Sequence, residues 1–464
     1  MARRGIMATG GGRLRPLALT AVVFFTVSGG PYGLEPLLSN VGAIPAILLV
    51  LVTPLLWSVP AILMVLELTS MMPRNGGYYQ WVKDALGPRW GFLEGWWSWL
   101  YTFADLAIYP VLFTQYLTFF APGVEPFHIV ICLAVIWGCV LLNLLGIVPV
   151  GRSSILLSIT VLFPFLILLA VALLRPELRM STDGSPHPAT LSGLGIGLFT
   201  VMWNYLGWDN ASTIAEEVEH PLRTYVVSIF SALALIVLMY LLSLLAAISS
   251  GADPRLLEHE GFPFLGSLLG GWWLGAVLSV GGMASALGLF LSTLLSISRV
   301  PKAMADDRLL PVSLGRIGTA RRVPYRSLVL CGIVISGMVL WGFSDLVIID
   351  VLLYGGALFL EFFSLIVLRI RQPERDRPFR VPLRLSGLVL LTLLPAGCWG
   401  IALGTLLLRE PVHLTSVLFA AAAFLTGPLA WWLTRHAPWT VPLLVPQTDP
   451  DRRNSRELPD HPMP

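Results

Sequence analysis

The feature that most constrains this chain is its series of long apolar runs. Twelve segments of roughly 18 or more residues are long enough to cross about 30 Å of hydrocarbon as α-helices, whose backbone polar groups bond to one another. The predicted spans are 17–40, 43–69, 89–121, 127–148, 152–174, 191–216, 224–249, 272–305, 326–343, 346–371, 386–408 and 413–434. The sequence therefore predicts an all-α integral membrane protein that crosses the lipid bilayer many times.

Composition excludes several classes of protein. Of the 464 residues 56% are hydrophobic and only 12% are charged, about half the charged fraction of an ordinary soluble domain. The net charge of +3 comes from 30 basic and 27 acidic residues, a balance that gives no reason to expect a nucleic-acid partner. The four cysteines and seven histidines do not follow the spacing of metal sites. We therefore expect no cofactor and no metal.

The basic residues predict the orientation. With both termini in the cytoplasm, 26 of the 30 Lys and Arg residues fall in cytoplasmic segments, as the positive-inside rule requires. We expect a protein of the cell (inner or plasma) membrane with a cytoplasmic segment at 1–16. The tail at 435–464 is rich in Pro, Asp and Arg and is expected to be cytoplasmic and disordered.

Two of the predicted spans are interrupted at corresponding places. The first contains Ser28-Gly29-Gly30-Pro31-Tyr32-Gly33, and the sixth contains the polar stretch 204–210. Paired interruptions point to a transporter with inverted repeats and a binding site at the breaks, although either break alone could be a simple kink. We predict five-helix repeats at 17–175 and 191–371, with two additional helices at 386–434.

Acidic side chains within the spans indicate the ligand. We single out Glu35, Asp105, Asp209, Asp350 and Glu361, while Lys and Arg occur only near span ends. Because a charge near the bilayer centre costs at least about 2.5–3.5 kcal/mol, such acids must be protonated, reach water or face a cation. Asp350 has the alternative of reaching the outer interface. Asp209 and Glu361 are the candidates for proton coupling.

We expect the substrate, a small organic cation or zwitterion, to contact the two breaks and the side chains that face them. Trp203 precedes the sixth-span break, where its ring could cover a cation. Asp105 and Tyr109 lie one turn apart and could instead serve helix packing. The predicted substrate-binding residues are Ser28, Gly29, Gly30, Tyr32, Glu35, Asp105, Tyr109, Trp203, Asn204, Tyr205, Trp208, Asp209, Tyr354 and Glu361.

Several motifs resemble the amino acid–polyamine–organocation (APC) superfamily over about 17–434. The stretches with this resemblance are 72–81, 85–88, 91–97, 207–209, 215–218 and 298–311. Within the superfamily the chain is most similar to plant-type polyamine uptake transporters, at 30–35, 109–113, 202–204, 208–213 and 360–362. The resemblance implies a LeuT-type fold with discontinuous first and sixth helices, alternating access and import driven by protons. Trp203 and Asp209 match a substrate-stacking tryptophan and a gating carboxylate of arginine–agmatine antiporters.

The sequence also departs from the amino-acid permeases of this superfamily. Those proteins usually have Gly-Ser-Gly at the first break, whereas Pro31 here removes an N–H donor. The predicted fifth span has no lysine, which some proton-coupled members carry. We therefore favour a proton-linked polyamine importer, monomeric or homodimeric, over an L-amino acid permease or exchanger. A membrane-embedded enzyme and a nontransporting sensor are weaker alternatives.

Overall fold

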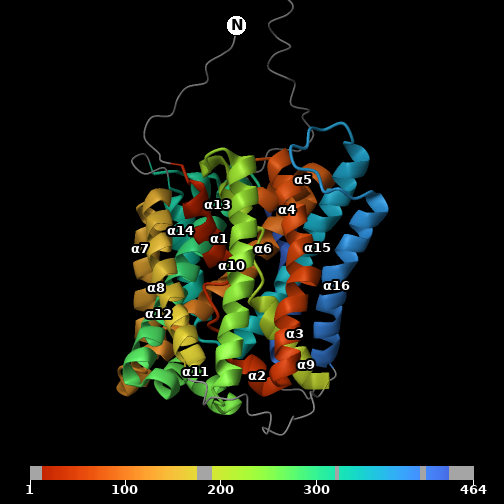
Figure 1. Ribbon diagram of the computed structural model, residues 1–464. Helices are drawn as coiled ribbons and strands as arrows, with labels where there is room; N and C mark the ends of the chain where they lie inside the picture. Colours follow the sequence, from red (N-terminus) through yellow and green to blue (C-terminus); the bar gives the residue numbers. More distant parts are fainter. Residues whose placement is uncertain (1–12, 175–190, 319–322, 408–413, 438–464) are drawn as a thin grey trace, which may run out of the picture.

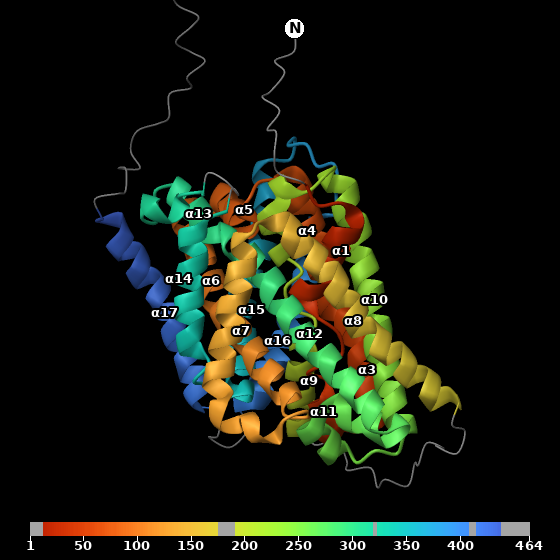
Figure 2. The same ribbon diagram turned by 90° about the vertical axis from the view of Figure 1, so that its left-hand side faces the viewer.

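The computed structural model describes residues 13–174, 191–318, 323–407 and 414–437 (Figure 1). Within these ranges the chain is helical, and the only β contact there is an isolated bridge between Leu14 and Val218. The helices form one bundle in which α1 begins and α17 ends at the same end (Figures 1 and 2). We call this the terminal end and the other the opposite end. Most of the predicted N-terminal segment and tail lie outside the described residues.

The first part of the bundle runs to Leu174. It contains α1 (Pro16–Val27), α2 (Glu35–Val41), α3 (Ala43–Thr53), η1 (Pro54–Ser58), α4 (Val59–Met71), α5 (Gly77–Leu86), α6 (Pro88–Leu117), η2 (Pro122–Phe127), α7 (His128–Leu144) and α8 (Ile147–Leu174).

The second part begins at Leu191. It contains α9 (Leu191–Trp203), η3 (Asn210–Glu217), α10 (Pro221–Ser249), α11 (Pro254–Gly270), α12 (Trp272–Ile297), α13 (Arg299–Asp306), η4 (Val312–Gly315), α14 (Tyr325–Met338), α15 (Phe343–Arg371), α16 (Leu385–Leu407) and α17 (Leu414–Arg435).

Eight helical segments among the described residues are long and apolar enough to cross a membrane. They lie at Ala43–Met71, Pro122–Leu144, Ile147–Val171, Pro221–Ser249, Trp272–Asp306, Asp345–Arg371, Leu385–Thr405 and Thr415–Arg435. Shorter apolar helices occupy Pro16–Val27, Gly193–Trp203 and Tyr325–Met338. Large apolar side chains such as Leu156, Leu390 and Leu425 are exposed on the outer surface of the bundle, as expected for groups that face lipid. The protein is a multi-pass membrane protein.

Helices α12 and α15 form the centre of the bundle. In the most apolar stretch of each helix, 78% of the stretch in α12 and 72% of that in α15 is buried inside the protein. The corresponding share is 28% for α16 and for α17. Helix α6 packs against both α12 and α15. A site carried by α6, α12 and α15 is therefore shielded from lipid by the surrounding helices.

The first predicted break is a gap between α1 and α2. Helix α1 stops at Val27, and Gly29, Gly30 and Gly33 adopt φ values of 64°, 107° and 94°. These angles are in the left-handed region, which glycine enters without the steric cost of a side chain. A Cβ atom on Gly29 would lie 2.6 Å from Leu289 on α12. The glycines thus let the chain leave helical geometry while in contact with α12.

The second break follows α9 and crosses the first. Gly207 has a φ of 86°, and a Cβ atom there would lie 2.2 Å from the carbonyl oxygen of Thr26. The chain resumes as a 3-10 helix, η3, in which Ile214 leaves helical geometry. This element is shorter and more irregular than α9, the helix before the break. Close contact between Gly207 and Thr26 brings the two breaks together at one point inside the bundle.

Buried ion pairs join elements at the terminal end. Glu67 on α4 accepts hydrogen bonds of 2.5 Å from both Nε and Nη2 of Arg369, and Arg377 Nε lies 3.2 Å from the same carboxylate. Glu67 is fully buried. Arg299 pairs with Glu217 at 3.1 Å and so holds α13 against η3. These contacts hold the elements of the terminal end together.

Candidate functional site

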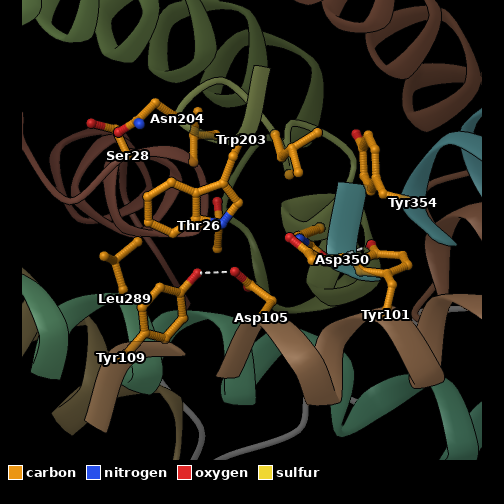
Figure 3. A pocket seen from close by; sticks show the side chains of 14 residues that line it. Thr26, Ser28, Tyr101, Asp105, Tyr109, Trp203, Asn204, Leu289, Asp350 and Tyr354 are labelled. Carbon is orange, nitrogen blue, oxygen red and sulfur yellow. Dashed lines mark hydrogen bonds between the residues drawn. The ribbon is translucent and has the colours of Figure 1, made fainter. Parts of the chain in front are cut away.

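A small cavity lies where the two breaks meet α6, α12 and α15 (Figure 3). Its volume is about 20 Å³, which is room for about one water molecule. The cavity is lined by Thr26, Val27, Ser28, Tyr101, Asp105, Tyr109, Trp203, Asn204, Leu206, Gly207, Asn210, Leu289, Asp350 and Tyr354. Six of these residues were predicted for the site: Ser28, Asp105, Tyr109, Trp203, Asn204 and Tyr354. The site is closed in this structure, and a substrate requires the surrounding elements to separate.

Asp105 on α6 forms one wall of the cavity. The hydroxyl of Tyr109, one turn further along α6, donates a 2.5 Å hydrogen bond to its carboxylate. The side chain of Trp203 also hydrogen-bonds Asp105, and Figure 3 shows the indole ring next to this carboxylate. Asp105, Tyr109 and Trp203 are therefore one connected group.

Asp350 on α15 lines the same cavity. Its side chain is 1% exposed, and its Oδ1 atom has no hydrogen-bond partner. The alternative that Asp350 reaches the outer interface is wrong, because α15 begins at Phe343, about two turns before Asp350, which places the residue about 10 Å along the helix. Asp105 and Asp350 thus bring two carboxyl groups to one small cavity.

Asp209 lies in the second break, behind two tyrosines. Tyr354 donates a 2.7 Å hydrogen bond to Oδ1, and the Tyr101 hydroxyl lies 3.4 Å from Oδ2 and 3.4 Å from Asn210 Oδ1. Asp209 does not line the cavity itself, whereas both tyrosines do. A cation in the cavity would reach Asp209 only if these hydroxyl groups moved.

Ser28 and Asn204 connect the two breaks. Tyr240 on α10 donates to Ser28 Oγ at 2.6 Å and to the carbonyl oxygen of Asn204 at 2.8 Å. The amide group of Asn204 in turn approaches the carbonyl oxygen of Gly33 at 3.4 Å. This network fixes how the two interruptions face each other, and Tyr240 was not predicted for it.

Several predicted site residues serve the surrounding structure instead of lining the cavity. Tyr32 donates to the carbonyl oxygen of Leu278 at 2.6 Å, and Tyr205 donates to that of Val50 at 3.0 Å. Trp208 is buried and its indole nitrogen has no hydrogen-bond partner. The remaining predicted residues that do not line this cavity are Gly29, Gly30, Glu35, Asp209 and Glu361.

Glu35 belongs to a second, larger cavity toward the opposite end. This cavity has a volume of about 390 Å³ and is lined by Gly33, Glu35, Pro36, Asn40, Leu112, Gln115, Tyr116, Ile196, Phe199, Thr200, Glu258, His259, Val347 and Ile348. Tyr116 donates to Glu35 at 2.8 Å, and the Gly33 N–H donates at 2.5 Å. A Cβ atom on Gly33 would lie 2.5 Å from the ring of Trp203. Trp203 therefore lies between the larger cavity and the smaller one.

Two further acids lie on the terminal side of the cavity. Glu361 on α15 is 1% exposed, and Glu94 on α6 is fully buried. Ser98 donates to Glu94 Oε1 at 3.0 Å, while Oε2 of each glutamate has no partner. Glu94 was not predicted, although its spacing of eleven residues from Asp105 repeats the spacing of Asp350 and Glu361. In the described ranges no Lys or Arg forms an ion pair with any of these acids.

Comparison with known proteins gives a consistent result. The model of a family described as amino acid permease matches residues 14–428. A protein named polyamine transporter RMV1 from Arabidopsis thaliana is 32% identical over 84% of this chain and 80% of its own length. Polyamine transporter PUT1 from Oryza sativa subsp. japonica is 34% identical over 85% of this chain and 74% of its own length. The methylthioribose transporter of Bacillus subtilis (strain 168) is 27% identical over 68% of this chain and 72% of its own length.

Proposed function

The chain belongs to the amino acid permease family, and we propose that within this family it is a secondary transporter that imports polyamines. Family and relatives make it a transporter and not an enzyme. The observation that carries the choice of substrate is the pair Asp105 and Asp350, two buried carboxyl groups on one cavity with no basic partner in the described residues. An ammonium group 4 Å from one carboxylate gains roughly 4 kcal/mol at an effective dielectric constant near 20.

The first break supports a cation over an amino acid. Amino-acid permeases that resemble this chain hold the substrate carboxylate on N–H groups of the first break. Here the Gly29 N–H donates to the carbonyl oxygen of Phe24 at 3.0 Å, and the Gly30 N–H donates to Ser28 Oγ at 3.0 Å. The Gly33 N–H donates to the carboxylate of Glu35. The chain therefore supplies its own acceptors, and few donors are left for a substrate carboxylate.

Proton coupling is part of the proposal, with Asp209 and Glu361 as the coupling residues. The two carboxyl groups are buried and close enough to interact, and two carboxyl groups that share a site favour a state in which one of them carries a proton. An ammonium group that reached this pair would compete with that proton for the same oxygens. Exchange of proton and ammonium at Asp209 is a direct way to link the two fluxes.

We also propose the topology. Twelve membrane crossings in two inverted five-helix repeats would turn the two breaks and the α6–α12–α15 core into the moving parts of alternating access. The distribution of basic residues supports a cytoplasmic terminal end. The larger cavity beside Glu35 would then open toward the outside, and the Glu67–Arg369 pair would close the inside.

Competition for uptake tests the choice of substrate. Purified protein in proteoliposomes should take up labelled putrescine in a saturable manner, and spermidine should compete with it. An L-amino acid permease or exchanger is the second candidate, because the matching family model is described as amino acid permease. Saturable leucine or arginine uptake without competition by polyamines would contradict the polyamine proposal and favour that alternative.

A further inference from the structure

Helices α6 and α15 carry acids in matched pairs. Glu94 and Asp105 on α6 are eleven residues apart, and so are Asp350 and Glu361 on α15. Eleven residues are about three helical turns, so the two acids of each helix share a face and are separated by about 16 Å along the axis. This spacing is longer than any single ammonium site requires.

The two helices pack antiparallel, which aligns these pairs. Arg371 at the end of α15 donates to the carbonyl oxygen of Ala85, just before α6 begins, at 3.3 Å. Midway along, the rings of Tyr101 and Tyr354 are in contact, with centroids 5.1 Å apart. The same register places Asp105 opposite Asp350 and Glu94 opposite Glu361. We call these pairs the outer tier and the inner tier.

Asp209 lies between the tiers. It accepts hydrogen bonds from Tyr101 and Tyr354, the ring pair midway between them. Five carboxyl groups thus lie along the contact of α6, α15 and the second break.

Both tiers present buried oxygen atoms without partners. These atoms are Asp350 Oδ1 in the outer tier, and Glu94 Oε2 and Glu361 Oε2 in the inner tier. All three side chains are at most 1% exposed. A buried polar group without a partner costs free energy that a ligand can recover. Glu35, the acid on the opposite side of Trp203, differs because Tyr116 and Gly33 already occupy its two oxygens.

We propose that the inner tier, Glu94 with Glu361, is a second ammonium-binding subsite that selects long polyamines. The inference rests on the proposed function and adds chain length to it. An extended chain advances about 1.2 Å per bond, as the backbone does, so the 13 bonds between the end nitrogens of spermine span about 16 Å. Its two ends match the two tiers, with Asp209 available to an inner nitrogen. Putrescine spans only about 6 Å and engages the outer tier, which lines the cavity, together with Asp209.

A ladder of linear α,ω-diamines tests this in the wild-type transporter. Diamines with 4 to 12 carbons compete with labelled putrescine in proteoliposomes, each beside the monoamine of equal carbon number, which corrects for apolar burial. The advantage of a diamine is the factor by which its inhibition constant is lower than that of the monoamine. We expect this advantage to increase by about tenfold or more near 12 carbons. An advantage that stays flat or falls with length contradicts the inference, while absence of competition by any polyamine contradicts the proposed function instead.

The variant Glu94→Gln locates the subsite. It should remove most of the length-dependent advantage and leave putrescine uptake within about twofold, which also shows that the variant is folded. Asp345→Asn is the control. This acid lies in the first turn of α15, the helix that also carries Glu361, and it accepts a 2.6 Å hydrogen bond from Ser416. Its substitution should change neither quantity. Two results would exclude the inner tier as the subsite. In one, Glu94→Gln shows the same dependence of the diamine advantage on chain length as the wild type. In the other, Glu35→Gln removes the advantage and Glu94→Gln does not.

Discussion

Asp209 accepts hydrogen bonds from Tyr354 and Tyr101 and lies between two pairs of buried acids. Its position depends on the glycine two residues before it, since Gly207 adopts a left-handed φ of 86° within the break that follows α9. The tyrosines keep the carboxyl group out of the cavity, so a substrate must exchange with their hydroxyl groups. At the scale of single residues, the site is a set of buried carboxyl groups, two of which accept hydrogen bonds from neutral tyrosine hydroxyl groups.

Asp350→Asn tests the role of the cavity acids. The change removes one of the two carboxyl groups on the cavity and keeps the shape of the side chain. We expect the KM for putrescine to rise by about tenfold or more, equivalent to about 1.4 kcal/mol. Because Oδ1 of Asp350 has no partner, the melting temperature of the detergent-solubilised protein should stay equal or rise. Asp345→Asn is again the control, and an unchanged KM in Asp350→Asn would refute the assignment.

The buried acids differ in how far their place in the site could be predicted from the sequence. Asp105, Asp209 and Glu361 were predicted because a charge inside an apolar run is costly wherever the helix packs. Asp350 was noticed but could be placed only by knowing where α15 begins. Glu94 was missed because it lies among tryptophans near a predicted span end, and only the packing of α6 on α15 gives its eleven-residue spacing a meaning.

At the scale of elements, the breaks depend on close backbone contact. Sequence predicted both interruptions from their glycines and polar residues. It did not predict that η3 would be an irregular 3-10 turn, because this shape depends on contacts with distant segments. Thr213 shows this directly, since its hydroxyl donates to the carbonyl oxygen of Ser296 at the end of α12 at 3.0 Å.

Gly207→Ala tests the crossing of the breaks. A left-handed conformation costs a non-glycine residue roughly 1–2 kcal/mol, and the new Cβ would lie 2.2 Å from the carbonyl oxygen of Thr26. We expect a lower melting temperature and loss of putrescine uptake. Gly404→Ala on α16 is the matched control, since a Cβ there meets nothing within 4 Å. It should leave uptake unchanged and the melting temperature equal or higher, because alanine is the better helix former. Equal behaviour of the two variants would disprove the close crossing.

Glu67→Gln tests the closure at the terminal end. The change leaves the buried guanidinium groups of Arg369 and Arg377 without their carboxylate, and breaking a buried pair in this way costs roughly 3–5 kcal/mol. Asp84→Asn breaks the partly exposed contact with Arg375 at 3.4 Å, which is worth at most about 1 kcal/mol. Thermal unfolding should separate the two variants clearly. A Glu67→Gln protein as stable as Asp84→Asn would show that the buried pair does not hold α4 to α15.

At the scale of the whole molecule, the scarcity of charge determines the environment of the chain. The resemblance to the APC superfamily is confirmed by the family match over residues 14–428. The long apolar helices place the chain in a membrane, and the acids that remain at the centre lack basic partners in the described residues. The arrangement of these acids depends on how α6, α15 and the two breaks meet, and this could not be derived from segments considered one by one.

Accumulation of putrescine against its concentration gradient tests the central claim most directly. Proteoliposomes with an imposed proton gradient should concentrate labelled putrescine, and a protonophore should abolish the accumulation. Asp209→Asn keeps an oxygen that can accept from Tyr354 and should remain folded, yet lose this accumulation. Accumulation of leucine that putrescine does not inhibit, or full putrescine accumulation by Asp209→Asn, would contradict the account.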